Sequence, residues 1–136
     1  MTYHCEVVFN YREVIKELIR LALNREKALT ISNQRDKETV INLGDISMEL
    51  TNEEKELSEF IGRLDFEVIK VIQTVMYIGR DGTKWDTPYD IYSNERKDMD
   101  DRGWNSKEIE ANHMESKMPL GSYLINGLGI LQIQLQ

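Results

Sequence analysis

Hydrophobic residues recur along much of the chain with the spacing of an amphipathic α-helix. The segment 11–28 shows this pattern clearly. Its Val14, Leu18 and Leu21 fall on one stripe, and charged residues fill the opposite side. We therefore expect a helix here that buries one face.

The most apolar helical pattern lies near residues 65–79. Its few polar residues form one narrow stripe, Glu67, Lys70, Gln73 and Thr74. A helix that is apolar on most of its circumference is buried on most of it. This segment is therefore predicted to be the central core helix, with Ile69, Ile72 and Met76 among the most buried residues.

Start and stop signals place further helices after the central one. Gly79 and Gly82 are expected to end the central helix sharply. Thr87 followed by Pro88 is a strong helix start, and this helix is expected to fray in its acidic end, "KDMDDRG". Two more helices are predicted to begin near residues 105–106 and at Pro119, the last with an apolar face.

Some segments depart from the helical period. Residues 30–50 are polar and irregular, which predicts a flexible connection with a brief strand at "TVINL". Both ends of the chain, "YHCEVVF" and "LQIQLQ", alternate with period two. They could be short strands that pair with each other or across a homodimer. The overall expectation is a mainly α helical bundle around the helix near 65–79, with short terminal β-strands left open.

Parts of this pattern resemble an uncharacterised family of small bacterial domains. The similarity is carried by "LSEFIGRLDFEVIKVIQTVMYIGRDG", by Trp85 with Asp86, and by "MPLGSYLINGLGIL". It covers roughly the C-terminal two thirds of the chain. This chain has Ile125 and Asn126 where the family has an acidic pair. The resemblance implies a small α-helical fold and no assigned activity.

Composition narrows the class of protein. The chain has 136 residues, of which 40% are hydrophobic and 30% charged, as expected for one globular domain spanning 1–136. Its net charge of −7 disfavours direct binding to nucleic acid, which needs basic residues against phosphates, and favours basic partners. No apolar run is long enough to span a bilayer, and the N-terminus lacks a signal-peptide pattern. We therefore expect a cytoplasmic protein.

The residues that could carry chemistry are few. Cys5 is the single cysteine, so no internal disulfide can form, and with His4 and His113 it cannot make a zinc site of the usual type. His4 and Cys5 are neighbours that point to opposite sides of an extended chain, so they are not a nucleophile–base pair. No phosphate-loop, nucleophile-elbow or zinc-protease pattern occurs. We therefore expect no catalytic residue, metal or cofactor.

The turn "YIGRDGTKWDTPYD" is the most unusual segment. Arg80 could offer a forked donor to a phosphate or carboxylate, or it could pair with Asp81 or Asp86 and stabilise the turn. We favour the structural interpretation, with the nearby aromatic residues buried as a patch. The acidic run after this turn does not match a calcium loop, so it is read as a solvated helix end.

The function favoured at this point is that of a noncatalytic acidic protein that binds another protein. A sharper form is an inhibitor from a phage or mobile element, which blocks a nucleic-acid-binding host protein by presenting acids in place of phosphates. The alternative is a small-molecule-binding or enzymatic protein with an anion site around Arg80. The candidate partner-binding residues are Arg80, Asp81, Trp85, Asp86, Tyr89, Tyr92, Asp98, Asp100 and Asp101.

Overall fold

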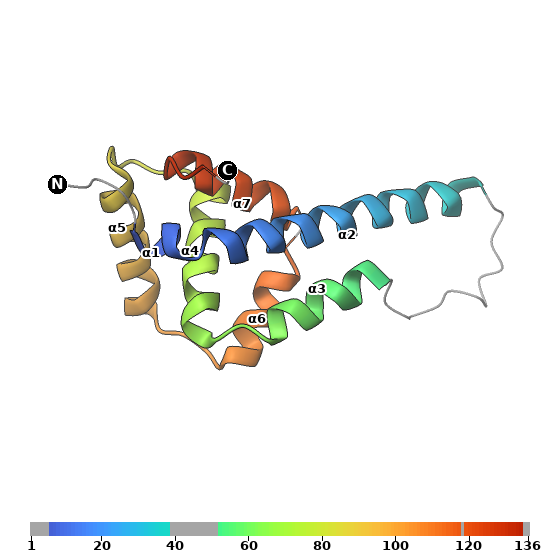
Figure 1. Cartoon of the computed structure of the whole chain (residues 1–136), viewed down its shortest axis with the longest axis horizontal. Coiled ribbons are helices and arrows are strands. Elements are labelled where there is room, and N and C mark those ends of the chain that lie inside the picture. Colours follow the sequence, from blue (N-terminus) through green and yellow to red (C-terminus); the bar gives the residue numbers. More distant parts are fainter. Residues whose placement is uncertain (1–5, 39–51, 118, 135–136) are drawn as a thin grey trace.

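The computed structural model describes residues 6–38, 52–117 and 119–134. Seven helices account for most of these residues, and no strand occurs among them. In chain order the helices are α1 (Glu6–Asn10), α2 (Arg12–Glu38), α3 (Asn52–Gly62), α4 (Phe66–Asp81), α5 (Pro88–Arg102), α6 (Lys107–Glu115) and α7 (Leu120–Ile130). The prediction of a mainly α bundle is confirmed (Figure 1).

Helix α4 lies at the centre of the bundle, as its apolar pattern predicts. It contacts α7, α5, α6 and α1, while α2 packs against α7 and α3 (Figure 1). Ile69, Ile72 and Met76 are fully buried, which confirms the predicted core positions. The predicted apolar face of α7 is buried against the same core, through Leu120, Leu124, Leu128 and Leu131.

Two glycines let α4 and α7 approach each other closely. A Cβ atom on Gly79 would overlap the backbone carbonyl oxygen of Tyr123, and one on Gly127 would overlap that of Val75. The prediction that Gly79 ends the central helix is therefore wrong, since this glycine lies inside α4 at the crossing. The helix ends at Gly82, which has φ of 76° and donates its N–H to Ile78 at 2.8 Å.

The helix starts after α4 agree with their sequence signals. The Thr87 side chain accepts a hydrogen bond from the N–H of Asp90, and Ser106 accepts one from Ile109. The expectation that α5 frays in its acidic end is wrong, because the helix continues to Arg102 and buries Met99. Met99 packs the last turns of α5 against the core, although the residues around it in the sequence are charged.

Helix α2 is longer than the sequence pattern predicts. It continues through Glu38, so the first part of the predicted irregular connection 30–50 is helical. The reason is that no glycine or proline interrupts this segment, and its Gln, Arg, Lys and Glu residues are good helix formers. The predicted brief strand, "TVINL", lies outside the described residues.

The described parts of both chain ends are not strands. Residues 6–10 form the short helix α1, which buries Val8 and leaves Phe9 exposed. After α7, Gln132 adopts φ of 59° and Ile133 donates its N–H to Leu128 at 2.9 Å, which closes a helix-ending turn. Alternation over so few residues does not separate a strand from a helix end that buries every second or third residue. Residues 3–5 and 135–136 lie outside the described part of the chain.

Two adjacent residues of α2 hold the junction between α6 and α7. Arg25 is buried and donates hydrogen bonds to the carbonyl oxygens of Glu115 and, at 2.9 Å, Lys117. Glu26 accepts a hydrogen bond from the N–H of Gly121 at 3.2 Å. A cation thus lies at the end of one helix and an anion at the start of the next, which suits both helix dipoles.

Candidate functional site

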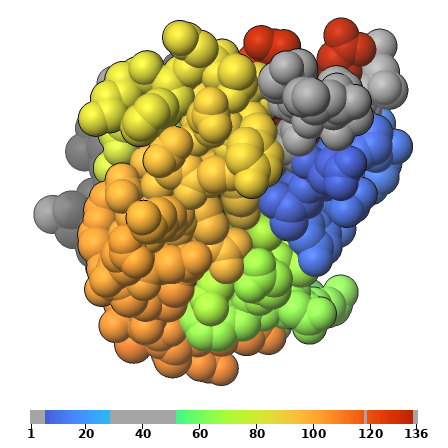
Figure 2. Space-filling model, turned by 90° about the vertical axis from the view of Figure 1, so that its left-hand side faces the viewer, coloured from blue at the N-terminus to red at the C-terminus, as the bar shows by residue number. Residues whose placement is uncertain are grey.

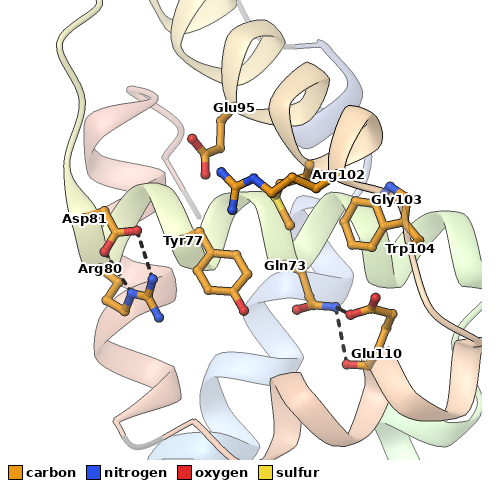
Figure 3. Close-up of a pocket in the computed structure, with 10 residues that line it drawn as sticks. Gln73, Tyr77, Arg80, Asp81, Glu95, Arg102, Gly103, Trp104 and Glu110 are labelled. Atoms are coloured by element: carbon orange, nitrogen blue, oxygen red, sulfur yellow. Dashed lines mark hydrogen bonds and ion pairs between the residues drawn. The ribbon is translucent and has the colours of Figure 1, made fainter.

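A polar hollow lies between α4, α5 and α6, and we call it the α4–α5–α6 hollow (Figure 3). Its volume is about 270 Å³. Charged, amide and aromatic side chains dominate its walls. The lining residues are Gln73, Tyr77, Arg80, Asp81, Glu95, Met99, Arg102, Gly103, Trp104 and Glu110.

Helical periodicity brings these side chains together. Gln73, Tyr77 and Arg80 lie at positions i, i+4 and i+7 of α4, so they share one face. Glu95 and Arg102 are seven residues apart on α5 and therefore also share a face. The two faces look across the hollow at each other (Figure 3).

The deep end of the hollow is an ordered polar network. Gln73 Nε2 donates to Glu110 Oε1 at 2.9 Å, and the N–H of Asn105 donates to Glu110 Oε2 at 2.8 Å. Burial acts to raise the pKa of Glu110, but these hydrogen bonds and nearby His113, at 3.6 Å, outweigh it and hold the pKa below its ordinary value. Glu110 is therefore a buried, ionised carboxylate.

Glu95 is in the opposite situation. Among the described residues it has no hydrogen-bond or ion-pair partner, although it lies within electrostatic range of Arg102. Burial raises the pKa of Glu95, and the negative charges of Asp98 and Asp81 act in the same direction. Its ionised form would gain from a positive charge placed in the hollow.

The two arginines of the hollow differ in the same way. Arg80 is bound through two hydrogen bonds to Asp81, from Nε to Oδ1 at 2.8 Å and from Nη2 to Oδ2 at 3.0 Å. Its guanidinium also lies over the ring of Tyr77, 4.6 Å from the centroid. Arg102, in contrast, forms no hydrogen bond or ion pair within the described part of the protein. The guanidinium open to an anion is therefore Arg102.

Trp104 forms the end of the hollow next to a second ion-pair network. Its Nε1 donates to Asp100 at 2.6 Å, and Asp100 also accepts from Arg96 at 3.0 Å. Arg96 extends this network to Glu67 on α4 through two hydrogen bonds, of 3.0 and 3.2 Å. These bonds raise the pKa of Arg96 despite the opposing effect of burial. Asp100 is thus a structural partner, although it lies in the exposed acidic end of α5, as the sequence predicts.

The structure separates the predicted partner-binding residues into three groups. Arg80 and Asp81 line the α4–α5–α6 hollow. Trp85 and Asp98 line a second hollow, of about 140 Å³, beside the loop after α4. Of the remainder, Tyr92 is buried and Asp86, Tyr89, Asp100 and Asp101 are exposed, with Asp100 bonded to Arg96 and Trp104.

The expected aromatic patch is only partly buried. Tyr92 is 6% exposed, whereas Trp85 is 45% and Tyr89 is 59% exposed. Tyr89 follows the first helical residue of α5 and points away from the bundle, because the core side of that turn is occupied by Pro88 and Ile91. The predicted pairing of Arg80 with Asp81 is confirmed. The interpretation of Trp85 and Tyr89 as buried residues is wrong.

Sequence reasoning missed several residues of the hollow, namely Gln73, Tyr77, Glu95, Arg102, Trp104 and Glu110. A signal existed for the α4 members, because a polar Gln73 inside an apolar helix shares its face with Arg80 two turns later. Glu95 and Arg102 share a face on α5 by the same rule. Nothing in the sequence places those two faces opposite each other.

No group of three or more His, Cys, Asp or Glu side chains within the described residues is arranged to hold a metal ion. Over the same residues, no helix is both long and apolar enough to cross a membrane.

No protein-family model, curated protein or solved structure matches the chain significantly. The resemblance to a family of small bacterial domains therefore stays a prediction.

Proposed function

We propose that this protein is a noncatalytic binding module and that it recognises a basic segment of another protein. The contact surface is formed by the loop 82–87 and the exposed side of α5. The observation that carries the proposal is the exposure of Trp85 and Tyr89, two large aromatic side chains four positions apart in the sequence. Exposed aromatic residues are typical anchors of protein interfaces.

The charges around these two residues specify the chemistry of the partner. The exposed acids Asp86, Asp90 and Asp98 belong to the same loop and helix. The loop and α5, yellow to gold, form the upper part of the face drawn in Figure 2, above α6. The whole chain carries a net charge of −7, so a basic segment would be attracted from a distance.

The second hollow adds a place for a partner side chain. It lies against Trp85, and its lining includes the apolar Ile78 and Ile91 and the acids Glu95 and Asp98. The carboxylates of Glu95 and Asp98, which outnumber the single lysine of the lining, Lys84, and the apolar side chains beside them suit a lysine or arginine side chain, whose methylene stem is apolar and whose end is charged. The surface thus favours a partner segment that combines basic and aromatic or aliphatic residues.

Site-specific photo-crosslinking tests the proposal. A photoreactive phenylalanine analogue replaces Tyr89 in one variant and Ile125, which is 46% exposed on α7, in the matched control. We expect the Tyr89 variant to crosslink one defined protein in cells and the Ile125 variant not to do so. Asp86→Asn combined with Asp98→Asn should weaken that crosslink. Equal labelling from both positions, or none from Tyr89, would contradict the proposed surface.

The inhibitor hypothesis is the sharper form of this proposal. If acids on α5 replace phosphates in a nucleic-acid-binding groove, the captured partner should itself bind DNA or RNA. An unlabelled duplex should then compete with the crosslink in proportion to its affinity for the partner. A partner that binds no nucleic acid would leave the binding module intact and remove the inhibitor interpretation.

A further inference from the structure

The α4–α5–α6 hollow contains polar groups that the protein itself leaves open. The Oε1 atom of Gln73, the carboxylate of Glu95, the hydroxyl of Tyr77 and the guanidinium of Arg102 all lack a hydrogen-bond partner among the described residues. Asp81 and Glu110, which line the same hollow, are already bonded. These open groups define the hydrogen-bond donors, acceptors and charges that a ligand would need in order to bind here.

Gln73 is the most informative of these groups because it is almost completely buried. Its side chain is 1% exposed, and its Nε2 atom is fixed by the carbonyl and the carboxylate of Glu110. This bond fixes the amide plane, so that Oε1 faces the hollow on the side of Tyr77 (Figure 3). Oε1 itself is open to the hollow, where water or a ligand can donate a hydrogen bond to it.

The charges of the hollow have two opposite preferences. Glu95 on one side is a partly buried carboxylate without a hydrogen bond among the described residues, and burial raises its pKa although the positive charges of Arg102 and Arg80 act against this. A cation in direct contact would favour its ionised form. Arg102, two helical turns along α5, has a free guanidinium that favours a carboxylate or another anion. A dianionic phosphate would meet the carboxylates of Asp81 and Glu95 with only one cation, among the described lining residues, that forms no ion pair, so the hollow disfavours it.

The size of the hollow restricts the ligand further. Sites for drug-sized molecules begin at about 300 Å³, and this hollow has about 270 Å³. Tyr77 and Trp104 provide aromatic wall on two sides. The ligand is therefore small, with its charged groups close together.

We propose that the α4–α5–α6 hollow binds a small zwitterion of the free α-amino acid class. The ammonium group donates to Gln73 Oε1 and to the carboxylate of Glu95. The carboxylate group accepts from Arg102. The ligand side chain lies against Tyr77 and Trp104. This site goes beyond the proposed protein-binding surface and does not depend on it.

Calorimetry and thermal unfolding with free amino acids test this site. The probes are the common α-amino acids at millimolar concentration, and for the best of them its N-acetyl and its carboxamide derivatives. We expect at least one amino acid to bind and to raise the melting temperature. Removing either charge should weaken binding by about tenfold or more, since each charged hydrogen bond contributes about 1.5–3 kcal/mol.

Matched variants localise the binding. Arg102→Gln and Glu95→Gln should each lower the affinity by about tenfold or more. Lys97→Gln and Asp101→Asn make the same charge changes on exposed positions of α5 that do not line the hollow, and they should leave the affinity unchanged. Circular dichroism confirms that each variant is folded. Trp85→Ala should not affect amino-acid binding, which separates this site from the proposed protein surface.

Several outcomes would overturn the proposal. Failure of every amino acid to bind would do so. If the N-acetyl and carboxamide derivatives bind as tightly as the free amino acid, the site does not recognise the two charges. Stabilisation by inorganic phosphate alone would identify an anion site instead. Binding that survives both Arg102→Gln and Glu95→Gln would place the ligand elsewhere.

Discussion

The two sides of α4 pack against their neighbours in different ways, one through close backbone contact and the other across a polar hollow. On one side Gly79 meets Gly127 of α7, and the backbones approach so closely that no side chain fits between them. On the other side Gln73 and Tyr77 face α5 and α6 across the α4–α5–α6 hollow. Close backbone approach excludes water and leaves no room for a ligand, whereas long polar side chains hold helices apart and create a site.

The largest effect is expected from a cavity within the core. Ile72 is fully buried and lies two turns before Gly79, on the same face of α4. Ile72→Ala should lower the free energy of unfolding by about 2–5 kcal/mol, because the close crossing restricts how far the helices can collapse into the space. Urea unfolding measures the change. An unaltered midpoint would mean that α4 is not the centre of the core.

Gly79→Ala tests the close crossing directly. The added methyl group would overlap the Tyr123 carbonyl, which is backbone and cannot rotate away. We expect a loss of about 1–3 kcal/mol from overpacking. Gly129→Ala is the matched control, since a Cβ there meets nothing within 4 Å and the helix should gain up to about 1 kcal/mol. If both variants gain stability, the helices are not in close contact.

Glu110 tests the polar side of α4 through pH. Its pKa is lower in the folded protein than its ordinary value of 4.5, so the folded state favours the ionised form. The stabilisation is therefore present above pH 4.5 and is lost as the pH falls towards the lowered pKa. Glu110→Leu should cost about 1–3 kcal/mol at neutral pH, because Gln73 and the N–H of Asn105 lose their acceptor.

The control for this experiment is Glu108→Leu, an exposed acid on the same helix. It should change neither the stability at neutral pH nor the acid limb of the pH profile. An acid limb that is the same in wild type and Glu110→Leu would show that Glu110 is not the group that titrates.

The smallest effect is expected at the rim. Arg80 and Asp81 form an ion pair, but their side chains are 39% and 54% exposed. Arg80→Ala should therefore change the stability by less than about 1 kcal/mol. Thermal unfolding in low and high salt measures this difference. A large loss that persists in high salt would mean that Arg80 belongs to the ordered floor of the hollow and not to its rim.

Sequence periodicity predicted the helices well because burial follows it directly. Ile69, Ile72 and Met76 are buried as their spacing requires, and Thr87 with Pro88 starts α5 as expected. The errors have a common origin in contacts between distant segments. A glycine such as Gly79 can end a helix or admit a neighbouring one, and only the position of α7 decides between these roles.

The hollow was less predictable than the fold for the same reason. Arg80 was identified from its unusual turn, and its partner Asp81 was among the expected ones. Glu95 and Arg102 look like ordinary charges on a solvated helix, and Glu110 looks like a surface residue. Whether these side chains are paired or buried depends on how α5 and α6 lie against α4, and the local sequence pattern does not give that arrangement.

The contacts of Arg25 and Glu26 have a consequence for how the chain folds. Their partners Lys117 and Gly121 are 92 and 95 positions away in sequence. The junction between α6 and α7 therefore cannot close until the beginning and the end of the chain have met. Such contacts of long sequence separation form late and slow the folding of a domain. During synthesis on the ribosome, α2 would emerge long before residues 117–121, which complete these contacts.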